Sequence, residues 1–336
     1  MKDNLTYLLE KQVITEEGKR LIEEYDKRLT QNNVAVIYNL RHLRKILKIK
    51  KSEQDLFFGD KRKENYRTFY IPKKTRGYRR IEAPNERLHQ IQKWVLNNII
   101  EKVCVSEFAK GFKKHSSIIE NAMPHIDKPL VINLDIKDFF HSINYGQVFR
   151  LFIYLGYTRE VSHLLTKLCT NANNVLPQGA PTSPVLSNIL MLRLDKRLST
   201  LAKKFRANYT RYADDITFSG DIYISKMIPI VLKIIADENL KVNFEKLRLQ
   251  YYYQPQIVTG LIVNKKLTVS KKIRKELTNA IYFCKKFGVD KHMQNINCNR
   301  TFYKEHLYGI AYFIKMINNE LGEKYIEELN QIEWAY

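Results

Sequence analysis

The apolar positions of the chain change their spacing several times, and each change predicts a new element. Apolar residues three or four apart predict helices, whereas a continuous apolar run predicts a strand covered on both faces. Helical spacing is found over 3–28, 33–49, 86–104, 146–170, 183–204, 225–239 and most of 270–332. Strands are expected over 66–72, 78–83, 129–136 and 241–264. This mixed order of helices and strands indicates an α+β fold.

Turn signals predict two hairpins and one helix start. Lys73–Gly77 connects the first two strands, and its glycine permits the turn. The segment NYTRYADDITFS at 208–219 alternates polar and apolar residues around a turn, which is typical of a second hairpin. Directly after the strand at 129–136, Ile136–Phe140 is expected to begin a helix whose backbone N–H groups would suit phosphate oxygens.

The net charge of the chain indicates the kind of molecule that it binds. The 336 residues include 57 Lys and Arg against 35 Asp and Glu, a formal net charge of +22. The chain is 44% hydrophobic, enough for a packed interior, and no apolar run reaches the length of a membrane span. The first residues lack the pattern of a signal peptide, so we expect a cytoplasmic protein without a membrane partner. A polyanion, and specifically nucleic acid, is the expected partner.

The excess charge is concentrated in two blocks. Residues 41–80 contain 15 basic and 4 acidic side chains, and residues 261–310 contain 11 basic and 3 acidic ones. Tyrosines and a phenylalanine are interleaved with the first block, as on surfaces that contact bases or sugars. The alternative is that each block is a solvated helix face.

Three aspartates form a candidate metal site. Asp214 and Asp215 are adjacent in the second hairpin, and Asp135 lies near the end of a buried strand. A buried carboxylate is costly without a counter-charge, and adjacent acids converge only around a cation. Together the three would offer the oxygen ligands that Mg²⁺ prefers, and a pair of such ions about 4 Å apart promotes in-line phosphoryl transfer. The alternative is a solvated Asp-Asp turn.

Three motifs resemble those of reverse transcriptases in their order and spacing. They are LDIKDFF at Leu134–Phe140, LPQGAPTSP at Leu176–Pro184 and YADD at Tyr212–Asp215, within a match over roughly 66–265. The resemblance implies RNA-directed DNA synthesis by a right-hand polymerase fold, with fingers, an antiparallel palm sheet that carries the YADD hairpin, and a helical thumb. It implies two Mg²⁺ ions, for which Mn²⁺ could substitute, at the catalytic residues Asp135, Asp214 and Asp215 and at Ile136.

The same resemblance divides the chain into three parts. Residues 1–128 would form the N-terminal helices and fingers. Residues 129–256 would form the palm, with a helical finger insertion near 146–175. Residues 257–336 would form the thumb and an RNA-binding region.

Motif positions also imply contacts to the incoming deoxynucleoside triphosphate. Phe140 lies where reverse transcriptases place an aromatic ring under the sugar, and such a ring would clash with a 2′-hydroxyl. Gln178 resembles the residue that contacts the nucleotide, and Gly179 lets the backbone approach it. Lys246, in NFEKLRL, matches a lysine that protonates pyrophosphate. Core packing for Phe140 and a surface position for Lys246 are the alternatives.

The expected fingers hairpin supplies further cations for the triphosphate, namely Lys74, Arg79 and Arg80. Arg79 and Arg80 alternate sides of a strand, so only one of them can face the site. We favour Arg80. A solvated strand face is the alternative for each of the three.

Two shorter strings resemble elements of bacterial retron reverse transcriptases. NAMPH at Asn121–His125 resembles their NAxxH element, and VTG at Val258–Gly260 resembles an element just before the thumb. An ordinary helix end and an ordinary strand end are the alternatives. We also expect no RNase H, endonuclease or long maturase region in a chain of this length. The residues implied to bind RNA are Asn121, His125, Val258, Thr259, Gly260, Lys271, Lys272, Arg274 and Lys275.

The retron resemblance implies a specific reaction and specific partners. The enzyme would bind a cognate structured noncoding RNA and copy part of it into RNA-linked single-stranded DNA, called msDNA, from deoxynucleoside triphosphates. An accessory effector protein would join the complex in defence against phage. The alternatives are an intron-derived or diversity-generating reverse transcriptase, and a non-catalytic RNA-binding scaffold of a defence complex.

Overall fold

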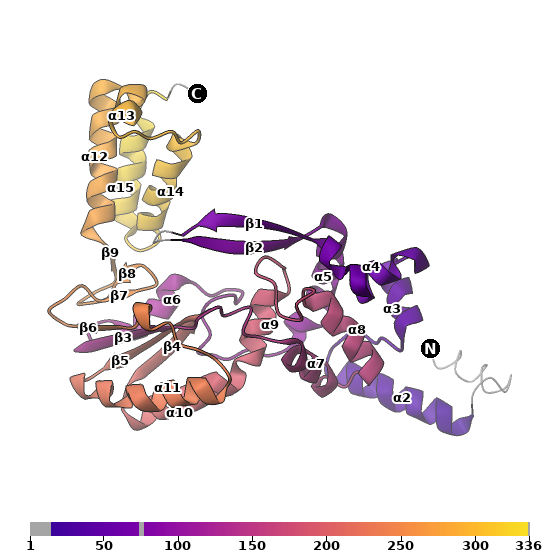
Figure 1. The fold of residues 1–336 in the computed structure, drawn as a ribbon. Helices are drawn as coiled ribbons and strands as arrows, with labels where there is room; N and C mark the ends of the chain where they lie inside the picture. The colour runs from indigo at the N-terminus through magenta and orange to yellow at the C-terminus, as the bar shows by residue number, and fades with distance from the viewer. Residues whose placement is uncertain (1–14, 74–76, 335–336) are drawn as a thin grey trace. The chain divides into compact units, whose positions relative to one another are not determined.

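A computed structural model describes residues 15–73 and 77–334. The chain forms two compact units, each built from separate stretches. The first unit comprises Met1–Lys113, Ile136–Leu198 and Leu232–Val242, and the second comprises Lys114–Asp135, Ser199–Val231 and Asn243–Tyr336. Helices and antiparallel sheets are mixed along the chain, which confirms the α+β class (Figure 1). The boundaries of the three expected parts stay a prediction.

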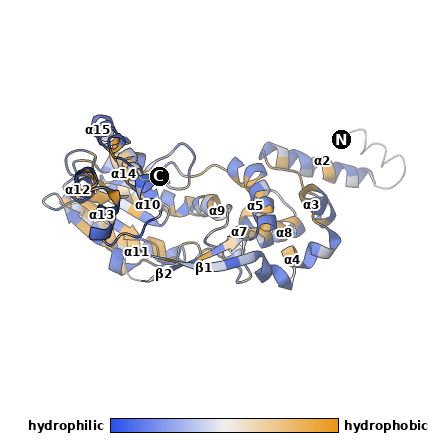
Figure 2. Ribbon diagram, turned by 90° about the horizontal axis from the view of Figure 1, so that it is seen from above, coloured by the Kyte–Doolittle hydropathy of each residue, from blue (hydrophilic) through white to orange (hydrophobic). Residues whose placement is uncertain are grey.

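The first unit is mainly helical and carries one two-stranded hairpin. Amphipathic helices account for most of it, and hydrophilic and hydrophobic residues alternate along α5 and α8 (Figure 2). In the hairpin, Tyr66 pairs with Pro84 and Pro72 pairs with Tyr78, which confirms the expected turn between them. The elements are α2 (Glu16–Gln31), α3 (Leu40–Leu47), α4 (Gln54–Phe58), β1 (Tyr66–Pro72), β2 (Tyr78–Pro84), α5 (Glu86–Asn98), α7 (Tyr145–Tyr154), α8 (Arg159–Cys169) and α9 (Ser183–Leu190).

The second unit contains a four-stranded antiparallel sheet in the order β4-β5-β3-β6. Its strands are β3 (Leu130–Asp135), β4 (Asn208–Tyr212), β5 (Asp215–Gly220) and β6 (Arg248–Tyr251). Five of the six side chains of β3 are buried, as its continuous apolar run predicts for a central strand. A smaller sheet follows, made of β7 (Ile257–Val258), β8 (Leu261–Ile262) and β9 (Thr268–Val269), and α6 (Ile118–Ala122) shares an apolar cluster with it.

The last part of the second unit is the expected helical region. It consists of α12 (Lys271–Phe287), α13 (Val289–Asn295), α14 (Tyr303–Lys315) and α15 (Asn319–Asn330). Leu277, Leu307 and Leu329 lie at the centre of a core that these helices build among themselves. Two further helices, α10 (Leu192–Lys204) and α11 (Ile228–Asp237), are divided between the units. No helix in the described ranges combines the length and the apolarity that crossing a membrane requires.

Several expected elements are interrupted or absent. The expected helix at 146–170 breaks between α7 and α8, where Gly156 has a φ of +100° that ends the first helix. The helix expected to begin at Ile136–Phe140 does not form: turns follow β3, and Asp138 adopts a left-handed φ of 49°. Helix α3 begins only at Leu40, because Asn39 caps it through its side chain. The beginning of the helix expected at 3–28 lies outside the described residues.

Candidate active site

The antiparallel sheet brings the predicted carboxylates together. Asp135 is the last residue of β3 and Asp215 the first of β5, and the two are register partners. Asp214 immediately precedes Asp215 in the turn of the β4–β5 hairpin, where Ala213 adopts a left-handed φ of 59°. Directly opposed residues in antiparallel strands have side chains about 5 Å apart. The expectation that the strand end lies beside the hairpin turn is therefore confirmed.

Lys246 contacts this carboxylate group. Its Nζ donates a hydrogen bond to Oδ2 of Asp135 at 2.7 Å. Lys246 ends a 3₁₀ turn, Phe244–Lys246, and the backbone N–H of Asn243 donates to the carbonyl of Asp135 at 2.8 Å. This turn is therefore fixed to the end of β3. Burial alone would lower the pKa of Lys246, but its hydrogen bond with Asp135 and the nearby acidic charges raise it overall.

The charges of this group are strongly coupled. Desolvation, followed by the charges of Asp214 and Asp135, raises the pKa of Asp215 to about 7, although part of its side chain is exposed. Asp135 is only 5% exposed and forms an ion pair with Lys246. Near neutral pH the group therefore holds a proton and an ammonium ion. Burial and the neighbouring carboxylates retain the proton, and the carboxylates retain the ammonium ion; a divalent cation would neutralise this negative charge more fully.

The carboxylates fit an open Mg²⁺ site better than a closed one. Across 15–73 and 77–334, no three His, Cys, Asp or Glu side chains are grouped as a ready-made metal cage. Mg²⁺ is commonly held by one or two carboxylates and completed by water and substrate phosphates. Asp135 and Asp215, with Asp214 adjoining, match that donor set. Ile136, the other predicted metal position, follows β3 with a buried side chain, so only its backbone carbonyl could serve as a ligand.

A cavity of about 200 Å³ lies beside the carboxylates. Its other wall is the turn Thr259–Gly260 between β7 and β8, and both turn residues have a positive φ, 46° and 85°. Two-residue hairpins of this kind require a left-handed backbone at both positions. A β-branched threonine rarely adopts it, so the turn is held by its surroundings. Further lining residues are Asn133, Thr217, Lys246 and Arg248.

Asn121 and His125 of NAMPH are buried, and Asn121 contacts this turn while His125 contacts the β4–β5 hairpin; Met123 is exposed. Nδ2 of Asn121 lies 3.5 Å from Oγ1 of Thr259, and that hydroxyl donates to the carbonyl of Ile118 at 3.3 Å. His125 is fully buried between Ser219 Oγ at 2.7 Å and Thr210 Oγ1 at 2.8 Å. Desolvation, with a smaller effect of the Lys128 charge, lowers the pKa of His125 to about 3. The imidazole is therefore neutral.

This burial corrects part of the predicted RNA contact. Asn121 is 1% exposed, and His125 and Val258 are fully buried, so their side chains do not meet RNA directly in this structure. Thr259 is partly exposed and Gly260 is exposed, and they remain available. The buried residues hold the exposed turn against the sheet.

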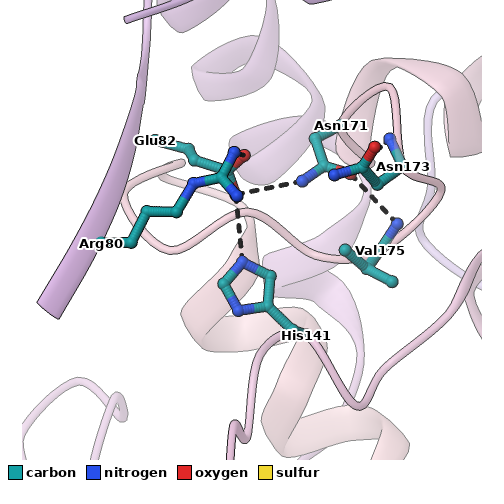
Figure 3. Close-up of polar contacts among 6 residues, drawn as sticks. All are labelled: Arg80, Glu82, His141, Asn171, Asn173 and Val175. Atoms are coloured by element: carbon teal, nitrogen blue, oxygen red, sulfur yellow. Dashed lines mark hydrogen bonds and ion pairs between the residues drawn. The ribbon is translucent and has the colours of Figure 1, made fainter. Parts of the chain in front are cut away.

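In the first unit, one predicted nucleotide-binding residue, Arg80, contacts a buried glutamate, Glu82, which also contacts His141 and Asn171 (Figure 3). Glu82 is 4% exposed and accepts hydrogen bonds from Arg80 Nη2, His141 Nε2 and Asn171 Nδ2, each at 3.0 Å. Arg80 and Glu82 are two residues apart on β2 and share a face, so Arg79 points to the other side as expected. Nothing in the structure tests which arginine meets a triphosphate.

The same glutamate fixes the loop with Gln178. The backbone N–H of Glu82 donates to the carbonyl of Gln178 at 2.8 Å. A Cβ at residue 179 would lie 2.9 Å from the carbonyl oxygen of Glu82, and Gly179 has a φ of +138°. Only glycine fits without strain here, because the backbone of Glu82 lies so close; the predicted approach to a nucleotide stays a prediction. Phe140 is half-buried, with ring centroids 5.8 Å from Phe112 and 5.5 Å from Phe139, and Lys74 lies outside the described residues.

Basic residues occupy the start of α12. Lys271, Lys272 and Lys275 are exposed, Arg274 is half-buried, and the first turn contains no acidic residue. Cations at a helix N-terminus oppose the helix dipole, so this placement lowers the stability of the helix. A cluster kept at an unfavourable position supports the predicted contact with a polyanion.

Sequence reasoning missed the partners that hold these residues. Glu82, His141 and Asn171 were not expected at the site, and Thr210 and Ser219 were not expected beside His125. The one local signal was the spacing of Arg80 and Glu82, two residues apart on a predicted strand. Their other contacts join residues far apart in the chain, which a single sequence does not reveal.

Comparisons with known proteins agree with the motifs. Residues 71–276 match the family described as "Reverse transcriptase (RNA-dependent DNA polymerase)". The Retron Ec86 reverse transcriptase of Escherichia coli is 34% identical over 276 residues, which cover 81% of this chain and 82% of that protein. The Retron Mx65 reverse transcriptase of Myxococcus xanthus is 35% identical over 282 residues, 78% of this chain and 64% of that longer protein.

Among solved structures, a telomerase from Candida albicans with a TWJ fragment of telomeric RNA matches with a TM-score of 0.41 and 13% identity. The match covers 80% of this chain and 61% of that one. A score this low carries no inference.

Proposed function

The chain belongs to the retron reverse transcriptases, and on that premise we propose that it is an RNA-directed DNA polymerase that makes msDNA. It binds a cognate structured noncoding RNA and copies part of it into single-stranded DNA that stays linked to the RNA. Deoxynucleoside triphosphates are its substrates, and the RNA–DNA product joins an accessory effector protein in defence against phage. The observation that carries the proposal is the cross-strand pair of Asp135 and Asp215, with Asp214 in the adjoining turn.

The chemistry proposed is two-metal nucleotidyl transfer. Two Mg²⁺ ions, when bound by Asp135, Asp214 and Asp215, would activate the attacking hydroxyl and neutralise the triphosphate. The primer hydroxyl loses its proton to solvent, its oxygen forms a bond to the α-phosphorus, and the bond to pyrophosphate breaks. Asp215 would hold a metal ion in its deprotonated form, with its proton released to solvent beforehand. Lys246 leaves the carboxylate of Asp135, and its ammonium group then supplies a proton to the departing pyrophosphate.

Selection of the incoming nucleotide is assigned to residues of the first unit. Arg80 binds the triphosphate, with Arg79 and Lys74 as the other cations of the hairpin. Phe140 packs against the sugar and excludes a 2′-hydroxyl. The loop at Gln178 and Gly179 contacts the nucleotide through its backbone and the glutamine side chain. The support is local: the buried carboxylate of Glu82 holds Arg80, and the backbone N–H of the same residue holds this loop at the Gln178 carbonyl.

Binding of the noncoding RNA is assigned to the exposed turn at Thr259–Gly260 and to the start of α12. The turn lines the same cavity as Asp135 and Asp215, and this neighbourhood supports a role in guiding the priming end of the RNA. The α12 lysines would neutralise phosphates.

The test is synthesis of RNA-linked DNA by the full chain expressed with its adjoining noncoding RNA locus. The parent should yield DNA whose electrophoretic mobility changes after RNase treatment. Asp214→Ala with Asp215→Ala should abolish it, whereas Asp290→Asn, at an exposed aspartate of α13, should not. Undiminished synthesis by the double variant would refute the site assignment. DNA without an RNA link would refute the retron reaction while leaving the polymerase in place.

A further inference from the structure

Another cavity, bordered by basic side chains, lies in the first unit, and none of the residues assigned above lines it. Its volume is about 410 Å³. It lies among the 3₁₀ turn Asp60–Asn65, the first residue of α7, helix α8 and the loop after α8. The side chains that matter in it are Asp60, Arg62, Tyr145, His163, Lys167 and Asn174.

Arg62 is a buried cation that has no carboxylate partner at hydrogen-bond distance within residues 15–73 and 77–334. It is 8% exposed, and its Nη2 donates to the carbonyl of Asn171 and, at 3.5 Å, to Oδ1 of Asn174. Its Nε is buried and has no hydrogen-bond partner among the residues that the structure describes. Burial of a guanidinium is unfavourable unless an anion compensates it. The two neutral acceptors orient this arginine but do not neutralise its positive charge.

Lys167 and His163 add to the positive potential. Both belong to α8, four residues apart on one face; Lys167 Nζ donates to the carbonyl of Phe58, and His163 Nδ1 bonds the hydroxyl of Tyr145. Burial and then the Arg62 charge lower the pKa of Lys167, and burial, Lys167 and Arg62 lower that of His163. Asp60 has the opposite effect on Lys167, but a smaller one than Arg62 has. The cations of this cavity therefore repel one another.

A purely structural role explains only part of this arrangement. The bonds from Arg62 to Asn171 and from Lys167 to Phe58 tie loops to helices, and neutral donors would do so without charge repulsion. His163 is exposed at the rim, so the cavity is open to solvent. Its volume exceeds that of a single phosphate and leaves room for an attached sugar.

We propose that this cavity binds a phosphate group carried by a nucleotide or by an RNA strand. Arg62 and Lys167 neutralise the phosphate, and His163 donates a hydrogen bond to one of its oxygens from Nε2–H, while the Tyr145 hydroxyl donates to Nδ1 and orients the ring. The class of ligand is set by the donors: two cations and an imidazole N–H around one space suit a tetrahedral oxyanion. The site is independent of the three aspartates.

The test is calorimetric titration of the full chain with three probes at constant ionic strength: inorganic phosphate, 5′-AMP and a short single-stranded RNA without a terminal phosphate. Lys167→Gln and His163→Gln should each weaken binding about tenfold, and Lys93→Gln, at an exposed lysine of α5, should leave it unchanged. His163 is exposed, so its variant should fold even if the Lys167 variant does not. Binding should persist in the Asp214→Ala, Asp215→Ala chain, which separates this proposal from the polymerase assignment.

The probes also distinguish the source of the phosphate. Tighter binding of 5′-AMP assigns the cavity to a phosphate monoester, and tighter binding of the oligonucleotide assigns it to the RNA backbone. A bound phosphate should also raise the pKa of His163, measured by histidine NMR. The proposal is overturned if no probe binds at millimolar concentration, or if the Lys93 variant weakens binding as much as the cavity variants do.

Discussion

Glu82→Gln is the sharpest perturbation that the site offers, because it preserves size while it removes a buried charge. Glu82 accepts three hydrogen bonds, from Arg80, His141 and Asn171. The glutamine would keep one oxygen acceptor and turn an NH₂ group toward groups that are themselves donors. Arg80 and His141 would then lose their charged acceptor, and one buried donor would be left unpaired.

The size of the effect follows from burial. A hydrogen bond to a charged group contributes about 1.5–3 kcal/mol when buried. The side chains of Arg80 and His141 are 46% and 33% exposed, so solvent reduces their shares. We therefore expect a total loss of about 2–4 kcal/mol, or a fall of roughly 3–6 °C in the thermal midpoint. The KM for deoxynucleoside triphosphates should rise several-fold, because Arg80 is no longer held.

A double-variant cycle separates this account from general destabilisation. If Glu82 acts through Arg80, Glu82→Gln should add little to the KM of an Arg80→Ala chain. The control is Glu107→Gln, at an exposed loop position, which should change neither the midpoint nor the KM. An unchanged midpoint, or effects on KM that simply add, would show that the glutamate does not position the arginine.

Three further outcomes are expected. Because the pKa of Asp215 is raised to about 7, the metal-free protein should lose stability as pH rises from 4 to 7. The apparent Mg²⁺ affinity in extension assays should fall roughly tenfold per pH unit below 7. A flat pH profile would contradict the raised pKa. Gly179→Ala should lower the stability of the protein by about 1–3 kcal/mol in thermal melts and impair nucleotide use. Gly260→Ala should lower it by only about 1 kcal/mol, because the space around a Cβ at residue 260 is open. Equal effects would refute the argument that the backbone of Glu82 leaves no room for a Cβ at residue 179. Replacing Lys271 and Lys275 by Gln should lower the salt slope of RNA binding by about 1 per lysine. The Lys271 change should also stabilise α12 by about 0.3–1 kcal/mol, because Lys271 lies in the first turn. An unchanged slope would show that RNA does not contact these lysines.

The parts of the fold that sequence reasoning predicted are those with strong local signals. The apolar run of β3 and the glycine turn between β1 and β2 both predicted the observed elements. The meeting of Asp135 and Asp215 was predictable because a strand-end acid and a hairpin-turn acid have few other partners. The helix expected at Ile136–Phe140 was wrong because Asp138 is left-handed there, and the sequence has no glycine to signal it.

What could not be predicted depends on contacts between distant residues. Glu82 lies 59 residues from His141 and 89 from Asn171, so its role as a shared acceptor is invisible along the chain. His125 lies 85 residues from Thr210 and 94 from Ser219. An isolated histidine in a polar string suggests a surface contact, and only the fold shows that two hydroxyl groups cover it.

The two retron-like strings are parts of one structure rather than two separate contacts. NAMPH supplies Asn121, which reaches Thr259 of the VTG turn, and His125, which bonds one residue on each strand of the hairpin that carries Asp214 and Asp215. The strings therefore act by holding a strained, exposed turn at a fixed place beside the carboxylates. The turn itself is therefore the part that we expect to contact RNA, and the buried residues determine the position of that turn.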